Sequence, residues 1–426
     1  MMQFTENPPP PPLYPTRPWP DFPNSAKSLG SFNNAACMEQ LLVHCAHAIE
    51  ANDATLAQQL LWVLHNIAPP EGDSNQRLTS AFLRALLLRA SRSGSSISGP
   101  ATPHHPQLPL RLSAISLAGF IDLTPWHRFG FSAANSAIAD AADGFPVLHL
   151  VDLTTTHCMQ IPTLIDVLAS RPEGPPFLRL TLPSTPASTS PPPTLDISLD
   201  ELGSRLVNFA RSRNVGMDFR VVPSTPADGF HSLLEYLGAN CNNAGEALVI
   251  NCHMMPHRIP DESAGGGILS PRTVFAKSLR SLDPSLVVLV DEEADFTSSD
   301  VVTRLRAAFN YMWIPFDAVE TFLPAASEQR RKYEAAVCWK IENVIAQEGV
   351  QRVERLEPRG RWGQRMRAAG FVGIGFGDEA AMEVKSMLDE HSAGWGMKRD
   401  DDDLVLTWKG HDVAFATAWV PSSATS

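Results

Sequence analysis

The sequence predicts an α/β fold, a Rossmann-like parallel sheet with an N-terminal helical cap. Five short apolar runs, rich in valine, isoleucine and leucine, recur between residues 147 and 291. Helical patterns separate most of these runs, and the chain before them shows helical periodicity only. Strands that alternate with helices form parallel sheets with right-handed crossovers, so we expect one such sheet preceded by helices.

The composition of the chain argues against some classes of function. The chain of 426 residues carries a formal net charge of −12, which argues against a protein that holds nucleic acid mainly by bulk electrostatics. No apolar run approaches the length that spans a bilayer, so no membrane partner is expected. The six cysteines are scattered without a C-x-x-C pair, as is typical of a reducing compartment.

We interpret the chain as an arm followed by one folded domain. Residues 1–37 hold clustered prolines and are expected to form a disordered, proline-rich arm. Residues 38–420 are expected to fold, with 38–145 as a mainly helical cap and 146–420 as the α/β core. Apolar spacing within the cap predicts three helices over 38–90 and single helices over 112–120 and 125–142.

The first predicted strand, 147–152, ends on Asp152 and leads through a turn into a helix over 160–170. Ligands of parallel sheets bind outside the carboxyl ends of the strands, where an acid can hold the ribose of a cofactor. A backbone that approaches a cofactor closely needs glycine, and none stands between Asp152 and Pro162. We therefore predict no cofactor. Asp152 is expected to be a structural acid that accepts backbone N–H bonds, and His149 a core histidine.

The remaining strands follow the same alternating pattern. Strands are predicted over 177–182, 217–222, 247–252, 286–291 and 371–375, with a hairpin that pairs 404–408 with 413–419. Helices are predicted over 197–213, 325–347 and 378–388. Five parallel strands followed by an antiparallel hairpin is the strand plan of class I methyltransferases. An S-adenosylmethionine-dependent methyltransferase, acting on a small molecule or protein, is therefore the alternative function that this pattern leaves open.

Acidic residues crowd the end of the fifth predicted strand: Asp291, Glu292, Glu293 and Asp295. Paired carboxylates can do acid–base chemistry or hold a hard metal ion. Consecutive acids before a helix more often form a solvated cluster that favours the helix dipole, and we expect this arrangement before a helix at Ser298.

A second group of metal-ligand types is spread over the fourth strand and its flanks: Cys241, Cys252, His253 and His257. Their spacing matches no closed zinc pattern, and no nucleophile elbow G-x-S-x-G is present. The sequence therefore predicts no catalytic, cofactor-binding or metal-binding residue.

A basic stretch is the main candidate for a nucleic-acid contact. Arg352 and Arg355 are expected to form internal salt bridges, with Arg352 and Glu354 as one pair. The four later arginines could bind phosphates through their guanidinium forks, and Trp362 could stack on a base. These candidate DNA contacts are Arg359, Arg361, Arg365 and Arg367.

Several ordered motifs resemble those of the plant GRAS family, over nearly everything from Met38 to Val420. The strand 148–152 with the segment after it resembles the VHIID motif, with Cys158 where the family usually has glycine and Ile161 where it has tryptophan. Residues 352–355 resemble the R-V-E-R of the PFYRE region, and the C-terminal tryptophans resemble the SAW region. The matching residues are Leu148, His149, Leu150, Val151, Asp152, Gln160, Pro162, Arg352, Glu354, Arg355, Trp362, Gly370, Trp408 and Trp419.

The resemblance implies a plant transcription regulator that is not an enzyme. Residues 38–42 and 126–131 look most like the scarecrow-like branch of the family. Family members act in the nucleus, mainly by binding other transcription factors or one another as homo- or heterodimers. Some are proposed to contact promoter DNA directly.

Overall fold

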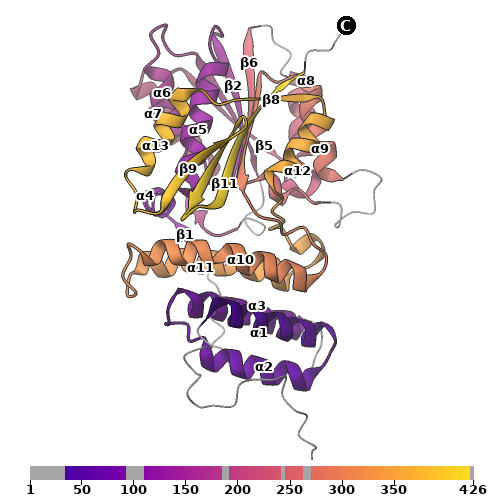
Figure 1. Ribbon diagram of the computed structural model, residues 1–426. Helices are drawn as coiled ribbons and strands as arrows, with labels where there is room; N and C mark the ends of the chain where they lie inside the picture. The colour runs from indigo at the N-terminus through magenta and orange to yellow at the C-terminus, as the bar shows by residue number, and fades with distance from the viewer. Residues whose placement is uncertain (1–33, 93–109, 185–190, 241–244, 262–269, 423–426) are drawn as a thin grey trace, which may run out of the picture.

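The computed structural model describes residues 34–92, 110–184, 191–240, 245–261 and 270–422 (Figure 1). All but the last few residues of the predicted arm 1–37 lie outside these ranges, as does Cys241. The described chain forms a nine-stranded sheet with helices on both faces and a helical layer below one end, and a separate two-stranded ladder joins β1 to β4.

The parallel half of the sheet confirms the strand plan predicted from sequence. Strand β2 lies in the middle, with β3 and β5 on one side and β6 and β7 on the other, all paired in parallel. In the register, Asp152 of β2 stands opposite Asn251 of β6. The five strands are β2 (Val147–Thr154), β3 (Phe177–Ser184), β5 (Met217–Pro223), β6 (Glu246–His253) and β7 (Leu286–Glu292).

An antiparallel edge completes the sheet. Strand β11 (His411–Pro421) pairs with β7, and the predicted hairpin partner β10 (Asp403–Trp408) pairs with β11. Strand β8 (Phe371–Ile374) pairs with the end of β11, and β9 (Trp395–Asp400) pairs with the outer side of β10. The order 5-3-2-6-7-11-10 confirms the methyltransferase-like plan, whereas β9 was not predicted.

Alternation along the strands creates a core on each face of the sheet. Leu148 and Leu150 point to the larger core, while Val151 and Leu153 belong to the smaller one. This is the period of two that a strand buried on both faces requires. The larger core is covered by α5 (Pro125–Ala141), α6 (Ile161–Ala169), α7 (Leu199–Ser212) and α13 (Asp378–Leu388); the smaller by α8 (His231–Asn240), α9 (Pro271–Ser281) and α12 (Arg359–Ala368).

Helix α5 approaches the sheet more closely than a side chain would allow. A Cβ built on Gly130 would lie 2.5 Å from the ring of His253 and 2.6 Å from Val290. A residue other than glycine would push α5 away from β6 and β7. Although α5 belongs to the segment 38–145 expected as a cap, it is a layer of the α/β core.

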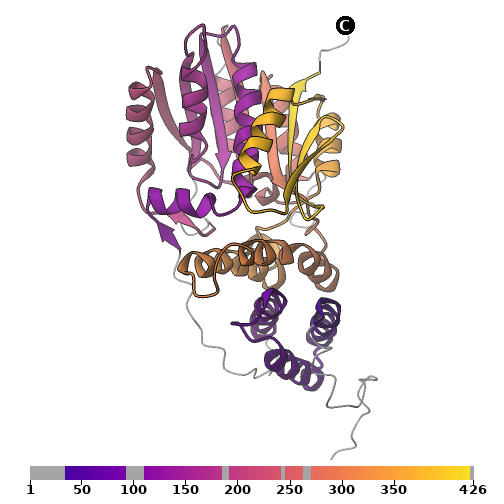
Figure 2. The ribbon, with the colours of Figure 1, turned by 60° about the vertical axis from the view of Figure 1, so that its left-hand side comes forward.

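The helical layer below the sheet is drawn from both halves of the chain. Helices α10 (Val301–Glu320) and α11 (Glu328–Ala346) lie directly under the sheet in Figures 1 and 2, and α1 (Ala35–Glu50), α2 (Ala54–Ile67) and α3 (Ser74–Arg92) lie beneath them. Helix α3 packs against both α10 and α11. Ion pairs from α3 to α11 reinforce this contact, including Arg77 with Glu334 at 3.2 Å. The cap thus differs from the expected 38–145: it consists of these five helices.

The short elements connect these layers. A helix α4 (Ala114–Ile121) precedes α5, and β1 (Arg111–Leu112) pairs with β4 (Thr194–Leu195) beside it. Single turns of 3-10 helix occur at Pro226–Asp228, Pro256–Arg258 and Gly349–Gln351. Within the described ranges, no helix is both long and apolar enough to cross a membrane.

Candidate functional site

The carboxyl ends of β2 and β6 carry a chain of hydrogen bonds between buried side chains, in which the Asp152 Oδ2 and the Asn251 Oδ1 have no partner among the described residues. Asn251 donates from its Nδ2 to Asp152 at 2.7 Å and to the side-chain oxygen of Gln160 at 2.9 Å. Gln160 in turn donates to Asn135 of α5 at 3.0 Å. Asp152 is therefore bonded to a side chain of the neighbouring strand, whereas we had expected backbone N–H groups at the strand end. The reason is that β2 continues to Thr154, so Asp152 lies inside the ladder.

The turn after β2 closes over the same acid. His157 and Cys158 adopt positive φ angles of 50° and 61°, a left-handed conformation that glycine adopts most easily. The Cys158 thiol is buried beside Asp152, whose Oδ2 has no hydrogen-bond partner among the described residues. Burial raises the pKa of Asp152 to about 7, although the hydrogen bond from Asn251 and the nearby Cys158 thiol act in the opposite direction. Together with the Asn251–Gln160–Asn135 chain, this arrangement is termed the closed edge.

His149 is a buried histidine with two partners. Its Nε2 lies 2.9 Å from the Thr181 hydroxyl, and its Nδ1 lies 3.3 Å from Glu246. Burial lowers its pKa to about 4, so the ring is neutral near pH 7. The predicted core role is therefore confirmed by its burial and its contacts.

The acidic residues at the end of β7 and just after it do not form the solvated cluster that the sequence suggested. Asp291 is fully buried and lies 2.7 Å from His257. Glu292 pairs with Lys340 of α11, and Asp295 pairs with Arg361 at 3.0 Å. Helix α10 begins at Val301 with Asp300 as its cap, so these carboxylates face separate cations rather than the start of a helix at Ser298.

Glu354 is the centre of a buried charge network that sequence analysis missed. Arg258 lies 2.6 Å from its carboxylate, His257 3.2 Å and Lys340 3.4 Å. Burial by itself would raise the pKa of Glu354, but these three cationic partners hold it well below its usual range. Burial likewise opposes a charged His257, whose pKa is nevertheless raised by the charges of Asp291 and Glu354. The network, with Glu292, thus holds Lys340 between two carboxylates.

The residues considered as zinc ligands contact different partners. His253 lies 3.1 Å from His127 of α5, His257 faces Asp291, and Cys252 is buried within β6. Burial lowers the pKa of His127 to about 4 and that of His253 well below its usual value. Among the described residues, no group of three or more His, Cys, Asp or Glu side chains is arranged to hold a metal ion.

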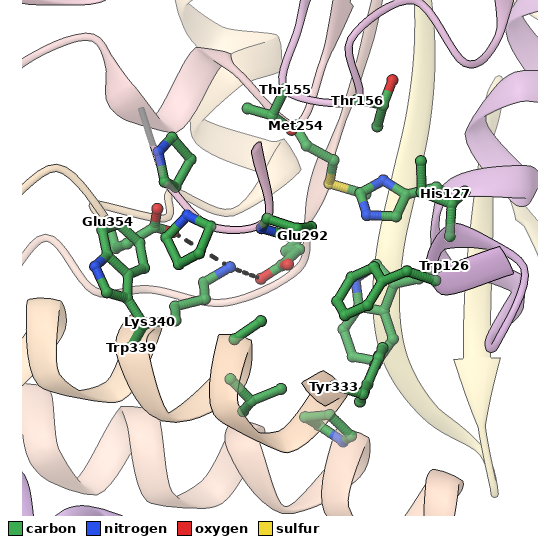
Figure 3. A pocket seen from close by; sticks show the side chains of 18 of the residues that line it. Trp126, His127, Thr155, Thr156, Met254, Glu292, Tyr333, Trp339, Lys340 and Glu354 are labelled. Atoms are coloured by element: carbon green, nitrogen blue, oxygen red, sulfur yellow. Dashed lines mark hydrogen bonds and ion pairs between the residues drawn. The ribbon is translucent and has the colours of Figure 1, made fainter. Parts of the chain in front are cut away.

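A pocket of about 160 Å³ lies between the sheet and the cap, above the charge network (Figure 3). One side is formed by residues at or just beyond the ends of β2, β6 and β7, including Thr155, Met254 and Glu292. Helices α4, α5, α10 and α11 supply the other side. Figure 3 shows Lys340 reaching across the floor to Glu292 and Glu354, with Trp126, His127 and Tyr333 toward the opposite wall. This place outside the strand ends is where parallel α/β sheets bind ligands.

The four candidate DNA-contact arginines lie on α12, and three of them pair with carboxylates. Arg359 faces Asp400, and Asp403 at 3.5 Å, near the turn between β9 and β10. Arg361 lies 3.0 Å from Asp295, and Arg365 makes two bonds of 2.9 and 3.0 Å to Glu357. The remaining arginine is Arg367, whose guanidinium stands 5.6 Å from the ring centre of Trp419. Arg361 and Arg367 are the exposed members of the four.

The arginines of the R-V-E-R segment are buried in internal contacts. Arg355 pairs with Asp261 at 3.0 Å, and Arg352 lies 3.9 Å from Glu348 while donating to backbone carbonyls. The expected Arg352–Glu354 pair is replaced by these contacts and by the network around Glu354. Sequence analysis also missed Arg272 of α9, fully buried, which pairs with Glu357 at 3.1 Å and stands 5.6 Å from the Trp362 ring centre.

The remaining motif residues make contacts or turns within the fold itself. Trp408 donates its indole N–H to Asp317 of α10 at 2.7 Å and so ties the hairpin to the cap. Trp419 donates to Thr417 at 2.8 Å. Gly370 has a φ of 91° in the turn between α12 and β8, and Pro162 lies in the first turn of α6. These contacts explain the residue types without a ligand.

Comparison with known proteins gives one consistent answer. The GRAS domain family model matches residues 38–420. Scarecrow-like protein 32 of Arabidopsis thaliana is 56% identical over 414 residues, which cover 96% of this chain and 98% of that protein. Protein SHORT-ROOT of the same plant is 30% identical over 420 residues, covering 94% of this chain and 76% of its own. The crystal structure of SCL7 from Oryza sativa, 22% identical, matches the fold with a TM-score of 0.70 over 90% of this chain and 99% of that one.

Proposed function

Because the chain belongs to the GRAS family of plant transcription regulators, we propose that it regulates transcription in the nucleus by binding other proteins. Its partners in this proposal are transcription factors and other GRAS proteins, including a second copy of this chain. No chemical step is part of the proposed function. The closed edge supports this view, since the acid that a nucleotide cofactor would need is buried and one of its oxygens already accepts a hydrogen bond from Asn251.

The outer face of α2 is the observation that carries the proposal. This helix contains no Lys, Arg, Asp or Glu, and its inner leucines Leu60 and Leu64 are buried against the cap. On the outer face, Trp62 is 64% exposed and Leu56 is 39% exposed. An exposed tryptophan on an uncharged surface is typical of protein interfaces, which are enriched in aromatic residues and depleted of charge at their centre.

A binding survey with matched variants tests this proposal. The full chain is probed against an array of plant transcription factors and GRAS proteins, as wild type, Trp62→Glu and Met382→Glu. Met382 of α13 is 63% exposed and far from α2 in sequence and fold, so it controls for an added surface charge. We expect the wild type and Met382→Glu to bind the same proteins and Trp62→Glu to lose them.

Two results would contradict the proposal in different ways. If Trp62→Glu keeps every partner, the docking surface lies elsewhere on the chain. If the wild type binds no transcription factor and no GRAS protein, the proposed function itself is wrong. Imaging of the tagged chain in plant cells checks the nuclear part, which fails if the protein is never found in nuclei.

Direct DNA contact is the second candidate, and the exposure of Arg361 and Arg367 on α12 is what favours it. Arg359 and Arg365 are held by carboxylates, so a reversal at Arg365 would set a new acid against buried Glu357 and disturb the fold. Arg361→Gln with Arg367→Gln is therefore the sharper variant.

If these two cations contact phosphates, the slope of log affinity against log salt should fall by roughly two. The control is Arg205→Gln with Arg213→Gln, at two exposed arginines, one in α7 and one directly after it. Unchanged binding in the first variant would exclude α12.

A further inference from the structure

Strand β8 is an element that the proposed function does not use. Figure 1 shows it at the end of the sheet opposite to the helical layer that carries α2. We infer that the open edge of β8 binds a short extended segment of a partner protein, in which an acidic residue stands between two apolar residues. This inference rests on the proposed role in binding proteins, but it concerns a surface separate from α2.

The backbone of β8 offers hydrogen-bonding groups along one edge. The Ser422 N–H donates to the Gly370 carbonyl at 2.9 Å, in the register that pairs β8 with β11. Bonded and non-bonded pairs alternate along an antiparallel ladder, so the next pair, Phe371 with Pro421, is not bonded. Proline has no N–H to donate, which fits a position without a bond to β8. The N–H and C=O groups of Phe371 and Gly373 therefore point to the opposite edge, where no other described strand pairs with β8.

The outer edges of the sheet are protected, whereas the edge of β8 is not. The outer strand β5 carries Asp218 and Arg220, and the outer strand β9 carries Lys398 and Arg399. Charged side chains on an edge strand hinder pairing with another chain. Strand β8 contains no charged residue and no proline. Its edge is thus the part of the described sheet that is most open to an added strand.

The side chains on one face of β8 favour apolar residues in the added segment. Val372 is 51% exposed and Ile374 is 37% exposed. They are two positions apart, so they point to the same face, beside Val420 and Ala418 of β11. Alternate apolar residues of an added strand would extend this row, and such cross-strand pairs are stabilising. Because β8 has only four residues, it suits a short segment.

A cation lies beside the other face of β8. A Cβ built on Gly373 would lie 3.5 Å from the Trp419 ring, so this face looks toward that indole. The Arg367 guanidinium stands 5.6 Å from the same ring centre, exposed and outside the ion pairs of the other three α12 arginines. Burial raises the pKa of Asp403, and the charges of Arg359 and Arg367 oppose that rise. Arg367 therefore lies on the side of α12 near β10, which adjoins β8 along the same edge of β11.

This cation selects an acid at one position of the segment. In an antiparallel added strand, the more stable arrangement per residue, the residue opposite Gly373 points its side chain to the face where Arg367 lies. A carboxylate there can accept charge-assisted hydrogen bonds from the guanidinium, whereas a lysine would be repelled. Asp402 lies beside Gly375 at the other end of β8, so an acid opposite that end would be repelled. The segment therefore has the order apolar, acidic, apolar.

Three rhodamine-labelled peptides separate these requirements. Ser-Ile-Glu-Val-Ser has the required order, Ser-Ile-Lys-Val-Ser reverses the charge, and a third peptide carries an N-methyl group on the glutamate nitrogen. In fluorescence anisotropy titrations with the full chain, the glutamate peptide should bind with a Kd on the order of 0.1 mM. The lysine peptide should bind about fivefold more weakly. The N-methylated peptide cannot donate to the Gly373 carbonyl, so it should show no saturable binding up to about 1 mM.

Matched variants place the peptide on β8. Gly373→Ala and Gly373→Pro add the same Cβ, which makes an ordinary contact with Trp419, but only proline removes the N–H on the open edge. We expect Gly373→Ala to bind the glutamate peptide like the wild type and Gly373→Pro to lose it. Arg367→Gln should lower the affinity of the glutamate peptide relative to the lysine peptide about threefold.

The inference is overturned if the glutamate peptide shows no saturable binding up to about 1 mM, or if Gly373→Pro binds it as well as Gly373→Ala does. Equal binding of the lysine peptide would overturn the acidic position. If Gly373→Pro does not fold, equal binding of the N-methylated peptide would overturn strand addition.

Two further outcomes separate this inference from its neighbours. Sedimentation tests whether a second copy fills the edge: a wild-type dimer that becomes a monomer in Gly373→Pro would overturn the partner segment. If the peptides fail to bind while the wild type still binds transcription factors or GRAS proteins in the survey, the inference about β8 is wrong and the proposed function stands.

Discussion

Two regions at the carboxyl ends of the same parallel strands differ in how their polar groups are used. At the closed edge, Asp152, Asn251, Gln160 and Asn135 form one chain of hydrogen bonds, and Cys158 covers the acid. At the ends of β6 and β7, the charge network around Glu354 lies under a pocket of about 160 Å³. A position outside strand ends is therefore not enough to make a ligand site, since side chains from neighbouring elements decide whether space and polar groups remain.

Loss of one side-chain group should lower the stability of the fold more in the charge network than at the closed edge. Glu354→Gln removes the carboxylate that faces Arg258, His257 and Lys340, so Arg258 loses its carboxylate while His257 keeps Asp291 and Lys340 keeps Glu292. Removing one partner of a buried ion pair costs roughly 3–5 kcal/mol of the free energy of unfolding. Urea denaturation measures this loss.

An exposed ion pair provides the control for that variant. Glu328 of α11 pairs with Lys332 at 2.6 Å on the surface, so Glu328→Gln should leave the urea midpoint unchanged within error. A Glu354→Gln protein as stable as Glu328→Gln would show that the network contributes little and that water enters it freely.

The next largest loss of stability is expected at the closed edge, when the side-chain amide of Asn251 is removed. Asn251→Leu removes the donor to both Asp152 and Gln160 while keeping a side chain of similar length. Leaving two buried acceptors without a donor should lower the free energy of unfolding by roughly 2–3 kcal/mol. Asn240→Leu is the matched control, because Asn240 is exposed and its amide donates to a carbonyl of its own helix. Equal stability of the two variants would mean that the hydrogen-bond chain is replaceable by water.

The five parallel strands could be predicted because each has a recognisable pattern in its own short stretch of sequence. The runs that became β2, β3, β5, β6 and β7 are apolar, short and bounded by turns, so local pattern was sufficient. Strand β9 was missed because its residues 396–400 include glycine, lysine, arginine and aspartate, as an edge strand does. With β9 missing, the position of Asp400 beside Arg359 could not be foreseen.

The side-chain contacts were less predictable because they join distant parts of the chain. Asp152 and Asn251 meet through the register of β2 with β6, and both lie near the ends of predicted strands, which was the only available signal. Lys340 reaches Glu292 because α11 turns back under the sheet, and α3 pairs with α11 over more than 250 residues. Periodicity within one helix cannot reveal such a contact, so the cap and the pocket above it needed the structure.

A pH titration sharpens the comparison at the closed edge. The pKa of Asp152 is raised to about 7 by burial, against about 3.9 in an unfolded chain. A raised carboxyl pKa stabilises the fold below pH 4, and this contribution is lost as pH rises through 7. Relative to Asp152→Asn, the wild type should therefore lose roughly 2 kcal/mol of unfolding free energy between pH 5 and pH 8. Parallel pH profiles of the two proteins would show that Asp152 does not titrate in this window.

The smallest effect is expected from S-adenosylmethionine, which we predict does not bind the closed edge. Its ribose hydroxyls would need the oxygens of an acid at the end of β2, but Asp152 is buried and one of its oxygens already accepts a hydrogen bond from Asn251. Its approach would also need a bare backbone after the strand, where His157 and Cys158 carry side chains at positive φ. Calorimetry of the full chain should therefore show no heat of saturable binding. Micromolar binding that disappears in Asp152→Ala would contradict this prediction and would revive the methyltransferase alternative, because that loss would place the cofactor on Asp152.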